Sequence, residues 1–540
     1  MTQYIYEEMF QYGKDETEYK KIVTEDIILE KFLDKKIITI TSKILEDITC
    51  EAFYDISHFL RKGHLIQLAN ILSDPEASDN DKDVALTLLK NANVAAGGIL
   101  PMCQDTGTAI VLAHKGSSIW TDYNDKEFIS KGISKAYSES NLRYSQLAPI
   151  SMYEEVNTKT NLPAQIDIYS INGNEYNFLF IAKGGGSANK SFFYQATPSI
   201  IRTKSLIEYV GPFIKQIGTS ACPPYHLAIV IGGTSAELNL KTLKLATCKY
   251  LDNLPLSGNK NGRAFRDIET EQQILEFTKN IGIGAQFGGK YFCHDVRVIR
   301  LPRHGASLPI SIGVSCGADR QAKGKITEEG VFLEKLEKNP SKYLPDVKTE
   351  NLSKSEISID LNSSIDEICN ILSKHPIETK VILNGPMIVA RDIAHGKMKE
   401  YLEKHGSLPD YFKKFPIYYA GPAKTPQGMP TGSFGPTTAG RMDSYVELFQ
   451  KHGASRVMLA KGNRSKIVAN SCKKFNGFYL GSIGGPGAFL AKNNIKKVDC
   501  IEFPELGMEA IWKIEVKNFP AFIVIDNKGN DFFDKFNIYQ

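Results

Sequence analysis

The sequence is short of the features that mark secreted and membrane-spanning proteins. Nine cysteines occur in 540 residues and no two of them form a CxxC pair, which argues against a disulfide-rich secreted scaffold and leaves reduced thiols or metal ligands. The longest apolar runs, such as Leu227 to Gly233, are strand-sized and fall far below the roughly 18 apolar residues of a membrane span. We therefore expect neither a disulfide framework nor a transmembrane role.

The chain also lacks an excess of charge of one sign. Its 65 basic and 61 acidic residues leave a net charge of +4, and no basic patch interleaved with aromatic residues is present, so a nucleic-acid partner is not expected. The first twenty residues contain several acidic residues and no apolar stretch, which fits neither a secretory nor a mitochondrial leader. The chain as given shows no targeting signal, and we expect it in the cytoplasm or the mitochondrial matrix.

A chain of this length exceeds what one hydrophobic core supports, so at least two domains are expected. Residues 1 to about 90 are predicted to be mostly helical, because apolar residues recur at helical spacing in 22–32, 53–72 and 84–89. Strand-like runs that end in glycine-rich or proline-rich turns alternate with helices from there on.

The chain changes character after Asp319, where a charged stretch poor in aromatic residues begins. We place an N-terminal domain at 1–330, a connection with one short helix at 331–358, and a second domain of strand-loop-helix units at 359–540. The predicted fold class is α/β, with an N-terminal helical plus α/β domain and a smaller C-terminal α/β domain.

Three cysteines lie in turn-forming loops beside polar groups: Cys103 in GGILPMCQDTGTA, Cys222 in TSACPPYHLA and Cys316 in GVSCGADRQA. Three thiolates can hold an iron-sulfur cluster and leave one iron open to a substrate oxygen, as a hydratase requires. Because the three are far apart in the sequence, spacing alone leaves zinc as a competing metal. The remaining six lie in ordinary amphipathic sequence and are interpreted as small buried hydrophobic residues. These are Cys50, Cys248, Cys293, Cys369, Cys472 and Cys500.

Seven ordered segments resemble the class I fumarases, the iron-sulfur fumarate hydratases, and the resemblance covers about residues 90 to 515. The segments are PMCQDTGTA, KGGGSANKS, CPPYHLAIVIGG, LPRHGASLPISIGVSCGADR, NGPMIVARDIAHGK, GPTTAGRMDSY and MLAKGNRS. The resemblance implies reversible hydration of fumarate to (S)-malate and a [4Fe-4S] cluster held by Cys103, Cys222 and Cys316. It also implies a homodimer whose active site lies between the cluster domain and a mobile C-terminal domain.

A substrate with two carboxylates calls for several cations, preferably arginines that grip a carboxylate with two hydrogen bonds. Candidates are Arg143, Arg391, Arg441 and Lys461, although arginines taken singly are usually solvated surface residues. Arg391 follows an apolar stretch, and Arg441 lies in the first turns of an expected helix, positions that often face a cleft. Gly186 can bring backbone N–H groups close to a carboxylate because it has no side chain.

The reaction needs one group that manages the proton of the hydroxyl and a base that removes a proton from carbon. Gln104 and Asp105 follow a candidate ligand directly, and Asp105 or His304 could manage the hydroxyl proton, although His304 fits a core histidine equally well. For the base, the resemblance points to Thr437. An alcohol is a poor base unless Lys461 or a helix N-terminus lowers its pKa. The alternative is that Thr437 or Thr438 only caps the following helix.

Other readings remain open at this point. The glycine-rich segments GIGAQFGG and KGGGSANK lack the spacing of dinucleotide and phosphate loops, so nucleotide binding is not expected. Dehydratases for related diacids, such as tartrate or mesaconate hydration products, would use the same arginines. A cluster-bearing sensor or a structural zinc protein would keep the cysteines without the catalysis.

Overall fold

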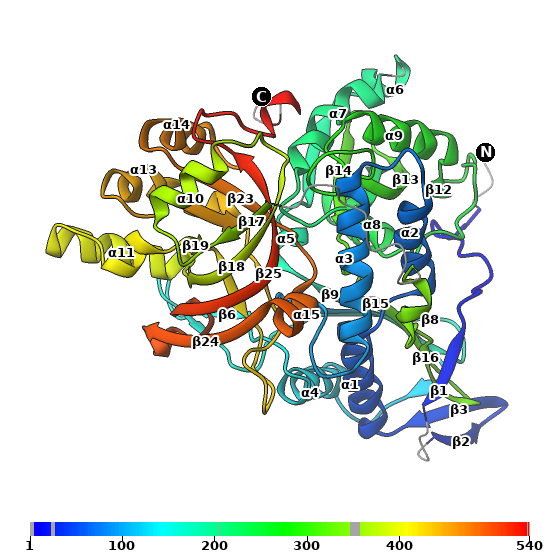
Figure 1. Ribbon diagram of the computed structural model, residues 1–540. Helices are drawn as coiled ribbons and strands as arrows, with labels where there is room; N and C mark the ends of the chain where they lie inside the picture. Colours follow the sequence, from blue (N-terminus) through cyan, green and yellow to red (C-terminus); the bar gives the residue numbers. More distant parts are fainter. Residues whose placement is uncertain (1–4, 23–26, 204, 346–356, 537, 539–540) are drawn as a thin grey trace.

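The computed structural model describes residues 5–22, 27–203, 205–345, 357–536 and 538. Its helices and strands form an α/β fold, which confirms the predicted class. Figure 1 shows two parts, an N-terminal part built on two sheets and a C-terminal part built on a third, with helix α3 (Asp79–Ala95) running between them. Among the helices of the described residues, none combines the length and apolar character of a membrane span.

The N-terminal region corrects one expectation. The stretch 22–32 was expected to be helical, but Tyr19–Ile22 is strand β1, and β2 (Ile27–Phe32) pairs antiparallel with β3 (Lys35–Ile40). Most of β2 is exposed, so its apolar residues reflect strand pairing rather than one buried helical face. The helices begin later, as α1 (Ser42–His58), α2 (Lys62–Ser73) and α3, whose start is capped by the side chain of Ser78.

Two sheets build the N-terminal part. The six-stranded sheet has the order β1-β16-β15-β9-β4-β8, and the five-stranded sheet has the order β10-β14-β11-β13-β12. The strands of the first are β4 (Thr108–Gly116), β8 (Gln165–Ile171), β9 (Tyr176–Lys183), β15 (Gln321–Thr327) and β16 (Gly330–Glu334), with β1. Those of the second are β10 (Phe192–Ala196), β11 (Tyr225–Gly233), β12 (Phe265–Arg266), β13 (Cys293–Arg303) and β14 (Leu308–Ser315).

Alternating side chains stack these sheets in layers. Along β4, Val111 packs toward α1 and α4, whereas Ile110 and Leu112 join Val230 of β11 in a core between the two sheets. The opposite face of β11, including Ile229, packs into the core that contains α2 and α3. The remaining elements are α4 (Asp125–Glu139), α5 (Gly185–Ala188), α6 (Ser199–Arg202), α7 (Leu206–Ile217), α8 (Ala236–Thr247), α9 (Ile268–Asn280), β5 (Ile119–Trp120), β6 (Leu147–Pro149) and β7 (Glu155–Asn157).

The C-terminal part is a seven-stranded sheet that closes on itself. Strand β18 pairs with β19, the chain of pairings continues through β22, β23 and β25, and β25 pairs back with β18. Its strands are β17 (Ile357–Asp360), β18 (Lys380–Val389), β19 (Ile417–Tyr418), β22 (Val457–Ala460), β23 (Phe478–Ser482), β24 (Ile495–Glu502) and β25 (Ile511–Ile525). The helices are α10 (Ile365–Leu372), α11 (Asp392–His405), α12 (Asp410–Lys414), α13 (Asp443–Lys451), α14 (Lys466–Phe475) and α15 (Gly487–Phe489). Short elements are η1 (Pro340–Tyr343), β20 (Ala420–Pro422), β21 (Phe434–Pro436), η3 (Ala439–Met442), η4 (Leu490–Asn494), η5 (Pro504–Glu509) and η6 (Asp534–Phe536).

The two parts share one hydrophobic core. Residues of α3 and β11 belong to the same buried cluster as residues of β18 and β25. The expected connection at 331–358 begins inside β16, which pairs with β15 in the N-terminal sheet, and its short helix is η1. Residues 346–356 of that connection lie outside the described residues. The sheets therefore bring loops from both parts of the chain to one shared boundary.

Candidate active site

The sheet topology brings two of the three loop cysteines together. Cys222 lies just before β11 and Cys316 just after β14, and these strands are antiparallel neighbours, so both cysteines lie at the same edge of the sheet. The Gly317 N–H donates to the Cys222 carbonyl at 3.0 Å and ties the two loops. Cys222 has a φ of 65°, which non-glycine residues rarely adopt and which recurs at functional sites.

The third cysteine reaches the same place from the loop between α3 and β4. Asn91 of α3 donates to the Met102 carbonyl at 2.9 Å and accepts from the Phe489 N–H at 2.9 Å. Cys103, the next residue, is buried, and its thiol lies 3.5 Å from Oε1 of Gln104. Asn91 therefore fixes the Cys103 loop between the N-terminal helices and the C-terminal part.

The three thiols interact electrostatically with one another and with buried cations. Burial raises the pKa of Cys222 to about 11, and Lys461, whose Nζ lies 2.9 Å from the Cys222 sulfur, opposes that rise. Burial also raises the pKa of Cys103, with Arg320 opposing it and Cys316 adding to it. Burial alone would lower the pKa of Lys461, but the three thiols more than offset it. The site is therefore one where thiolates form only with positive charge beside them.

The spacing of the three sulfurs distinguishes between metal types. A single zinc ion with bonds of about 2.3 Å holds its sulfurs roughly 3.8 Å apart. Within the described residues, these cysteines do not form a group whose ligand atoms all lie within 4.8 Å of one another. A Cβ on Gly484 would lie 2.4 Å from the Cys222 sulfur, so only glycine fits at this position. The arrangement suits a group larger than one ion.

A cavity with a volume of about 430 Å³ lies beside the thiols and is lined from both parts of the chain. Its wall includes eight residues expected at the site, namely Gln104, Asp105, Arg143, Gly186, Arg391, Thr437, Arg441 and Lys461. A larger cavity of about 830 Å³ lies against the N-terminal segment and contains none of them. The smaller cavity is the candidate active site because four cations line it and one of them, Lys461, contacts the Cys222 sulfur.

Acidic residues orient the cavity's arginines from the C-terminal side. Arg391 follows β18 and precedes α11, and its Nε lies 2.8 Å from Oε1 of Glu509. Arg441, in η3, lies 3.3 Å from Asp392 and also donates to the Thr437 hydroxyl. Burial raises the pKa of Glu509, although Arg391 opposes that rise. Two guanidinium groups are thus held at the cavity wall in fixed orientations.

The N-terminal side contributes an acid with its own cation. Asp105 lies 3.3 Å from Arg143 and accepts a hydrogen bond from the Gly185 N–H at 2.8 Å. Burial raises the pKa of Asp105, but Arg143 and Arg320 outweigh burial and leave it below its usual range. Asp105 is therefore a carboxylate in the cavity. Beside it, Gln104 is buried and donates to the Pro436 carbonyl at 3.0 Å.

Thr437 lies in the cavity wall rather than at a helix cap. The short helix that follows it begins after Thr438, whose side chain makes no capping hydrogen bond. The backbone of Thr437 is fixed because its N–H donates to the Tyr419 carbonyl at 2.8 Å and its carbonyl accepts from the Lys461 N–H at 3.2 Å. Thr437, Arg441 and Lys461 are thereby presented to the cavity together.

One expected residue lies apart from the others. His304 is exposed in the turn between β13 and β14 and does not line the cavity of its own chain. Conversely, sequence reasoning missed Arg320, Asp392 and Glu509. Arg320 could have been found, because it lies in the same motif as Cys316, GVSCGADRQA. Glu509 carries no local signal, since it ends a short helix far from every recognised motif.

Comparisons with known proteins agree over nearly the whole chain. The family described as Fumarate hydratase (Fumerase) matches residues 46–325, and the family described as Fumarase C-terminus matches residues 330–536. The class I aerobic fumarate hydratase of Escherichia coli is 55% identical over 99% of this chain and 98% of its own length. Fumarate hydratase 2 of Leishmania major is 56% identical over 96% of this chain and 92% of its own. The mitochondrial fumarate hydratase 1 of the same organism is 59% identical over 90% of this chain and 88% of its own length. The chain belongs to the class I fumarate hydratase family.

Proposed function

We propose that this protein is a hydro-lyase that interconverts fumarate and (S)-malate with a [4Fe-4S] cluster held by Cys103, Cys222 and Cys316. The observation that carries the proposal is one cavity in which four cations surround space for a small diacid, and in which one of them, Lys461, also contacts the buried Cys222 thiol. The family membership supports the same reaction, because relatives that are 55% and 56% identical to this chain are named fumarate hydratases.

The residues present fit the proposed cluster. Three loops supply three thiols that are spaced more widely than a single ion requires, and Gly484 leaves room beside the Cys222 sulfur. Lys461 and Arg320 supply positive charge against the thiolates and the negatively charged group that they would hold. When bound through three cysteines, such a cluster supplies an iron without a protein ligand, which serves as a Lewis acid for a substrate oxygen.

The chain's own residues bind and orient the diacid. Arg391 and Arg441 reach the cavity from the C-terminal part and Arg143 from the N-terminal part, so a substrate with two carboxylates bridges the two parts. At Gly186, in α5, a side chain would be crowded, because a Cβ would lie 3.2 Å from the Ser220 carbonyl oxygen. Its N–H belongs to the first turn of that helix and is free to bind a carboxylate. Binding across the boundary excludes water and fixes the carbon-carbon bond.

Thr437 and Asp105 serve the two proton transfers. In dehydration Thr437 takes the C3 proton in its alkoxide form and becomes the neutral alcohol, and the Arg441 guanidinium that donates to its oxygen stabilises the negative charge of the alkoxide. The alkoxide forms when the hydroxyl releases its proton to solvent before the substrate binds. Lys461 lies nearby and adds positive potential. Because Asp105 is ionised, it accepts a hydrogen bond from water and receives its proton during hydration.

His304 enters this scheme only through a second copy of the chain. It is absent from the wall of its own cavity, so a role with the hydroxyl requires the predicted homodimer to bring the partner's turn into the site. Mixed dimers test this. An Asp105→Asn chain co-expressed with a His304→Asn chain should recover part of the activity that each variant loses alone. Absence of any recovery would confine His304 to a structural role.

The reaction itself is tested by anaerobic purification and assay. We expect a brown protein that contains iron and sulfide, bleaches in oxygen and hydrates fumarate faster than mesaconate. Dehydration assays with malate and tartrate then separate the fumarate reaction from that of a related dehydratase. A colourless protein that contains only zinc, or a coloured protein without turnover of any of these diacids, would overturn the proposal.

A further inference from the structure

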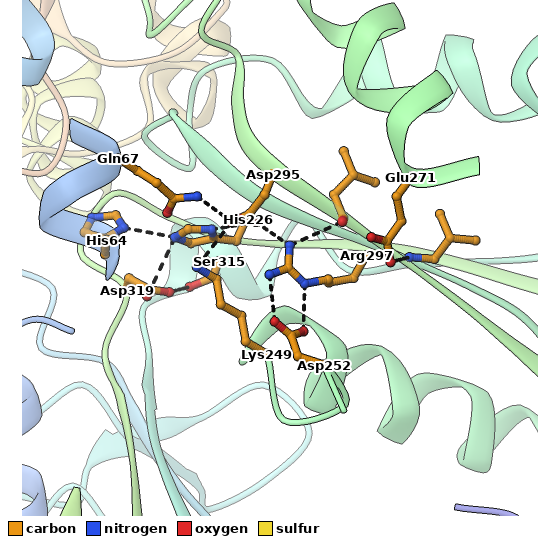
Figure 2. A network of polar contacts seen from close by, with 12 residues as sticks. His64, Gln67, His226, Lys249, Asp252, Glu271, Asp295, Arg297, Ser315 and Asp319 are labelled. Atoms are coloured by element: carbon orange, nitrogen blue, oxygen red, sulfur yellow. Dashed lines mark hydrogen bonds and ion pairs between the residues drawn. The ribbon is translucent and has the colours of Figure 1, made fainter. Parts of the chain in front are cut away.

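A buried chain of histidines and carboxylates lies behind the cysteines, outside the cavity (Figure 2). His64 of α2 and His226 of β11 are each at most 2% exposed, and their ring nitrogens Nδ1 and Nε2 lie 2.9 Å apart. The other nitrogen of His64 lies 3.1 Å from the Gly317 carbonyl, and the other nitrogen of His226 lies 2.8 Å from Asp295. The reaction scheme above uses none of these side chains.

The hydrogen bonds of His64 and His226 require one proton more than two neutral imidazoles carry. A carbonyl and a carboxylate only accept hydrogen bonds, so both outer nitrogens must carry a hydrogen. The contact between the inner nitrogens needs one more hydrogen. Two neutral imidazoles have only two N–H groups, whereas this arrangement uses three. The pair of His64 and His226 therefore holds one extra proton and one positive charge.

The surroundings locate that charge on His226. Its Nε2 lies 3.7 Å from Oδ2 of Asp319, a buried oxygen without another hydrogen-bond partner, and its Nδ1 faces Asp295. His64 faces a neutral carbonyl instead, and burial lowers its pKa to about 4. A third histidine, His294, packs against both rings, and burial together with its neighbours lowers its pKa well below the usual range.

Carboxylates on both sides of His226 favour one such proton. Asp295 and Asp319 are two carboxylates, and Lys249, 3.2 Å from Asp295, supplies one positive charge. Arg297 also approaches Asp295 but is paired with Asp252 through contacts of 2.7 and 2.8 Å. Arg61 also interacts with Asp319 but is paired with Glu334, and buried Lys183 interacts with Asp319 together with the Cys248 and Cys316 thiols. A protonated His226 is the cation that lies between the two carboxylates. Buried charges without such compensation are costly.

A divalent metal ion at the same point fits less well. Together, His64, His226 and Asp319 present three ligand atoms within 4.8 Å of one another. However, the 2.9 Å between the two nitrogens is a hydrogen-bond length, shorter than the roughly 3.3 Å between nitrogens on one tetrahedral zinc ion.

We propose that His226, which the hydrogen-bond chain places between two carboxylates as an imidazolium, is a positioning residue that holds the Cys222 and Cys316 loops together for the cluster. His226 lies on the strand that follows Cys222, and it pairs across the sheet with Ser315, the residue before Cys316. Ser315 donates to Oδ1 of Asp319 at 2.8 Å, and the Asp319 N–H donates to the Cys316 carbonyl at 2.9 Å. The imidazolium thus attracts the carboxylate that closes the Cys316 turn. This inference rests on the cluster assignment for its role but not for its charge.

The charge is tested by a double-mutant cycle on the full-length protein. His226→Gln should leave one negative charge in excess and Asp319→Asn one positive charge, so each should lower the unfolding midpoint in urea. The double variant restores the balance and should be more stable than His226→Gln alone, and its loss should be smaller than the sum of the single losses. Additive losses would show that His226 is neutral and would overturn the proposal.

The positioning role is tested by iron retention at a temperature where every variant is folded. His226→Gln should release iron to an anaerobic chelator roughly 10- to 100-fold faster, the scale on which groups that orient metal ligands act. The double variant should recover part of this loss. Ile129→Ala, a buried residue of α4 in a separate core, is the control for general destabilisation and should retain iron. Equal iron loss in the control and in His226→Gln would reduce His226 to a structural residue.

Two outcomes separate this inference from the proposed function. A wild-type protein that binds no iron would defeat the cluster assignment, whereas the stability cycle would still decide the charge of His226. Metal analysis adds a further check, because we expect no metal beyond the iron of the cluster. The contrary result is one additional metal atom per chain that remains in the Cys103→Ser/Cys222→Ser/Cys316→Ser variant and is lost when His226→Gln is added. It would show that a metal ion, and not a proton, lies between His64 and His226.

Discussion

The two sides of the active-site cavity differ in how their charged groups are held. On the N-terminal side, the Cys222 and Cys316 loops are joined by a backbone hydrogen bond at a sheet edge, and the chain of His64 and His226 lies behind them. On the C-terminal side, Arg391 and Arg441 contact Glu509 and Asp392, and both arginines face open space. The first side fits the proposed cluster, which stays bound, and the second fits the proposed diacid, which binds and leaves.

The largest expected effect breaks the N-terminal side. Cys222→Ser should remove both iron and hydratase activity, because a cluster held by two thiolates and a hydroxyl lacks its third strong ligand. Cys472→Ser is the matched control, since Cys472 is fully buried in the C-terminal part and is interpreted as a packing residue. Iron, sulfide and activity measured on the same anaerobic samples check this. Full iron content in Cys222→Ser would contradict the ligand assignment.

The next effect breaks the chemistry on the C-terminal side and leaves the thiols intact. Thr437→Val removes the oxygen that takes the proton, and kcat should fall roughly 100- to 10,000-fold, the usual contribution of a positioned acid or base. The absorption spectrum of the cluster should not change. Thr438→Val is the control, because Thr438 also lines the cavity but its hydroxyl has no assigned step. A fall in kcat below about tenfold would remove Thr437 from the mechanism.

A smaller effect tests binding geometry on the same side. Arg441→Lys keeps the charge but loses the planar fork, and kcat/KM should fall about ten- to a hundredfold because hydrogen bonds to charged groups contribute roughly 1.5 to 3 kcal/mol. Arg456→Lys changes an arginine paired with the exposed Asp366, away from the cavity, and should have almost no effect. Equal values for the two variants would show that Arg441 does not contact the substrate.

The sequence predicts the site better than it predicts its own first forty residues. Most of the predicted cavity residues lie in motifs at strand ends and helix starts, where loops from different elements meet, and the motifs contain seven of the eight, all except Arg143. The apolar residues of 22–32 recur at a spacing that predicts a helix, but part of this stretch is the exposed strand β2. Strand β2 forms by pairing with β3, and the spacing of residues within 22–32 does not reveal that partner.

The parts of the site that sequence could not predict are those set by distant contacts. Glu509 reaches Arg391 across more than a hundred residues, and no local pattern distinguishes it from an exposed acid. His64 and His226 come from different elements of the N-terminal part, and only their 2.9 Å contact reveals a shared proton. His304 has the opposite problem, since its motif predicts a catalytic role that the fold of one chain does not provide.

The smallest expected effect removes a negative charge that opposes the substrate. Glu509 forms an ion pair with Arg391 and accepts a hydrogen bond from the Ile393 N–H, and Glu509→Gln keeps an acceptor oxygen in the same position. The neutral side chain repels a dianion less, so KM should fall about two- to fivefold, as expected for a contribution of roughly 1 kcal/mol or less from one partly solvated charge. Glu509→Ala loses the acceptor and should raise KM instead, which separates charge from orientation.

The same variant makes a prediction about the pH dependence of stability. Because burial raises the pKa of Glu509 above its ordinary value of 4.5, the folded state binds the proton more tightly than the unfolded state. That stabilising contribution is complete below pH 4.5 and is lost as the pH rises through the raised pKa. At neutral pH Glu509→Gln should therefore be the more stable protein, and its advantage should disappear toward pH 4.5. Urea unfolding at several pH values checks this. A constant difference would show that Glu509 does not change its charge, and the C-terminal side would then hold Arg391 through a permanent ion pair.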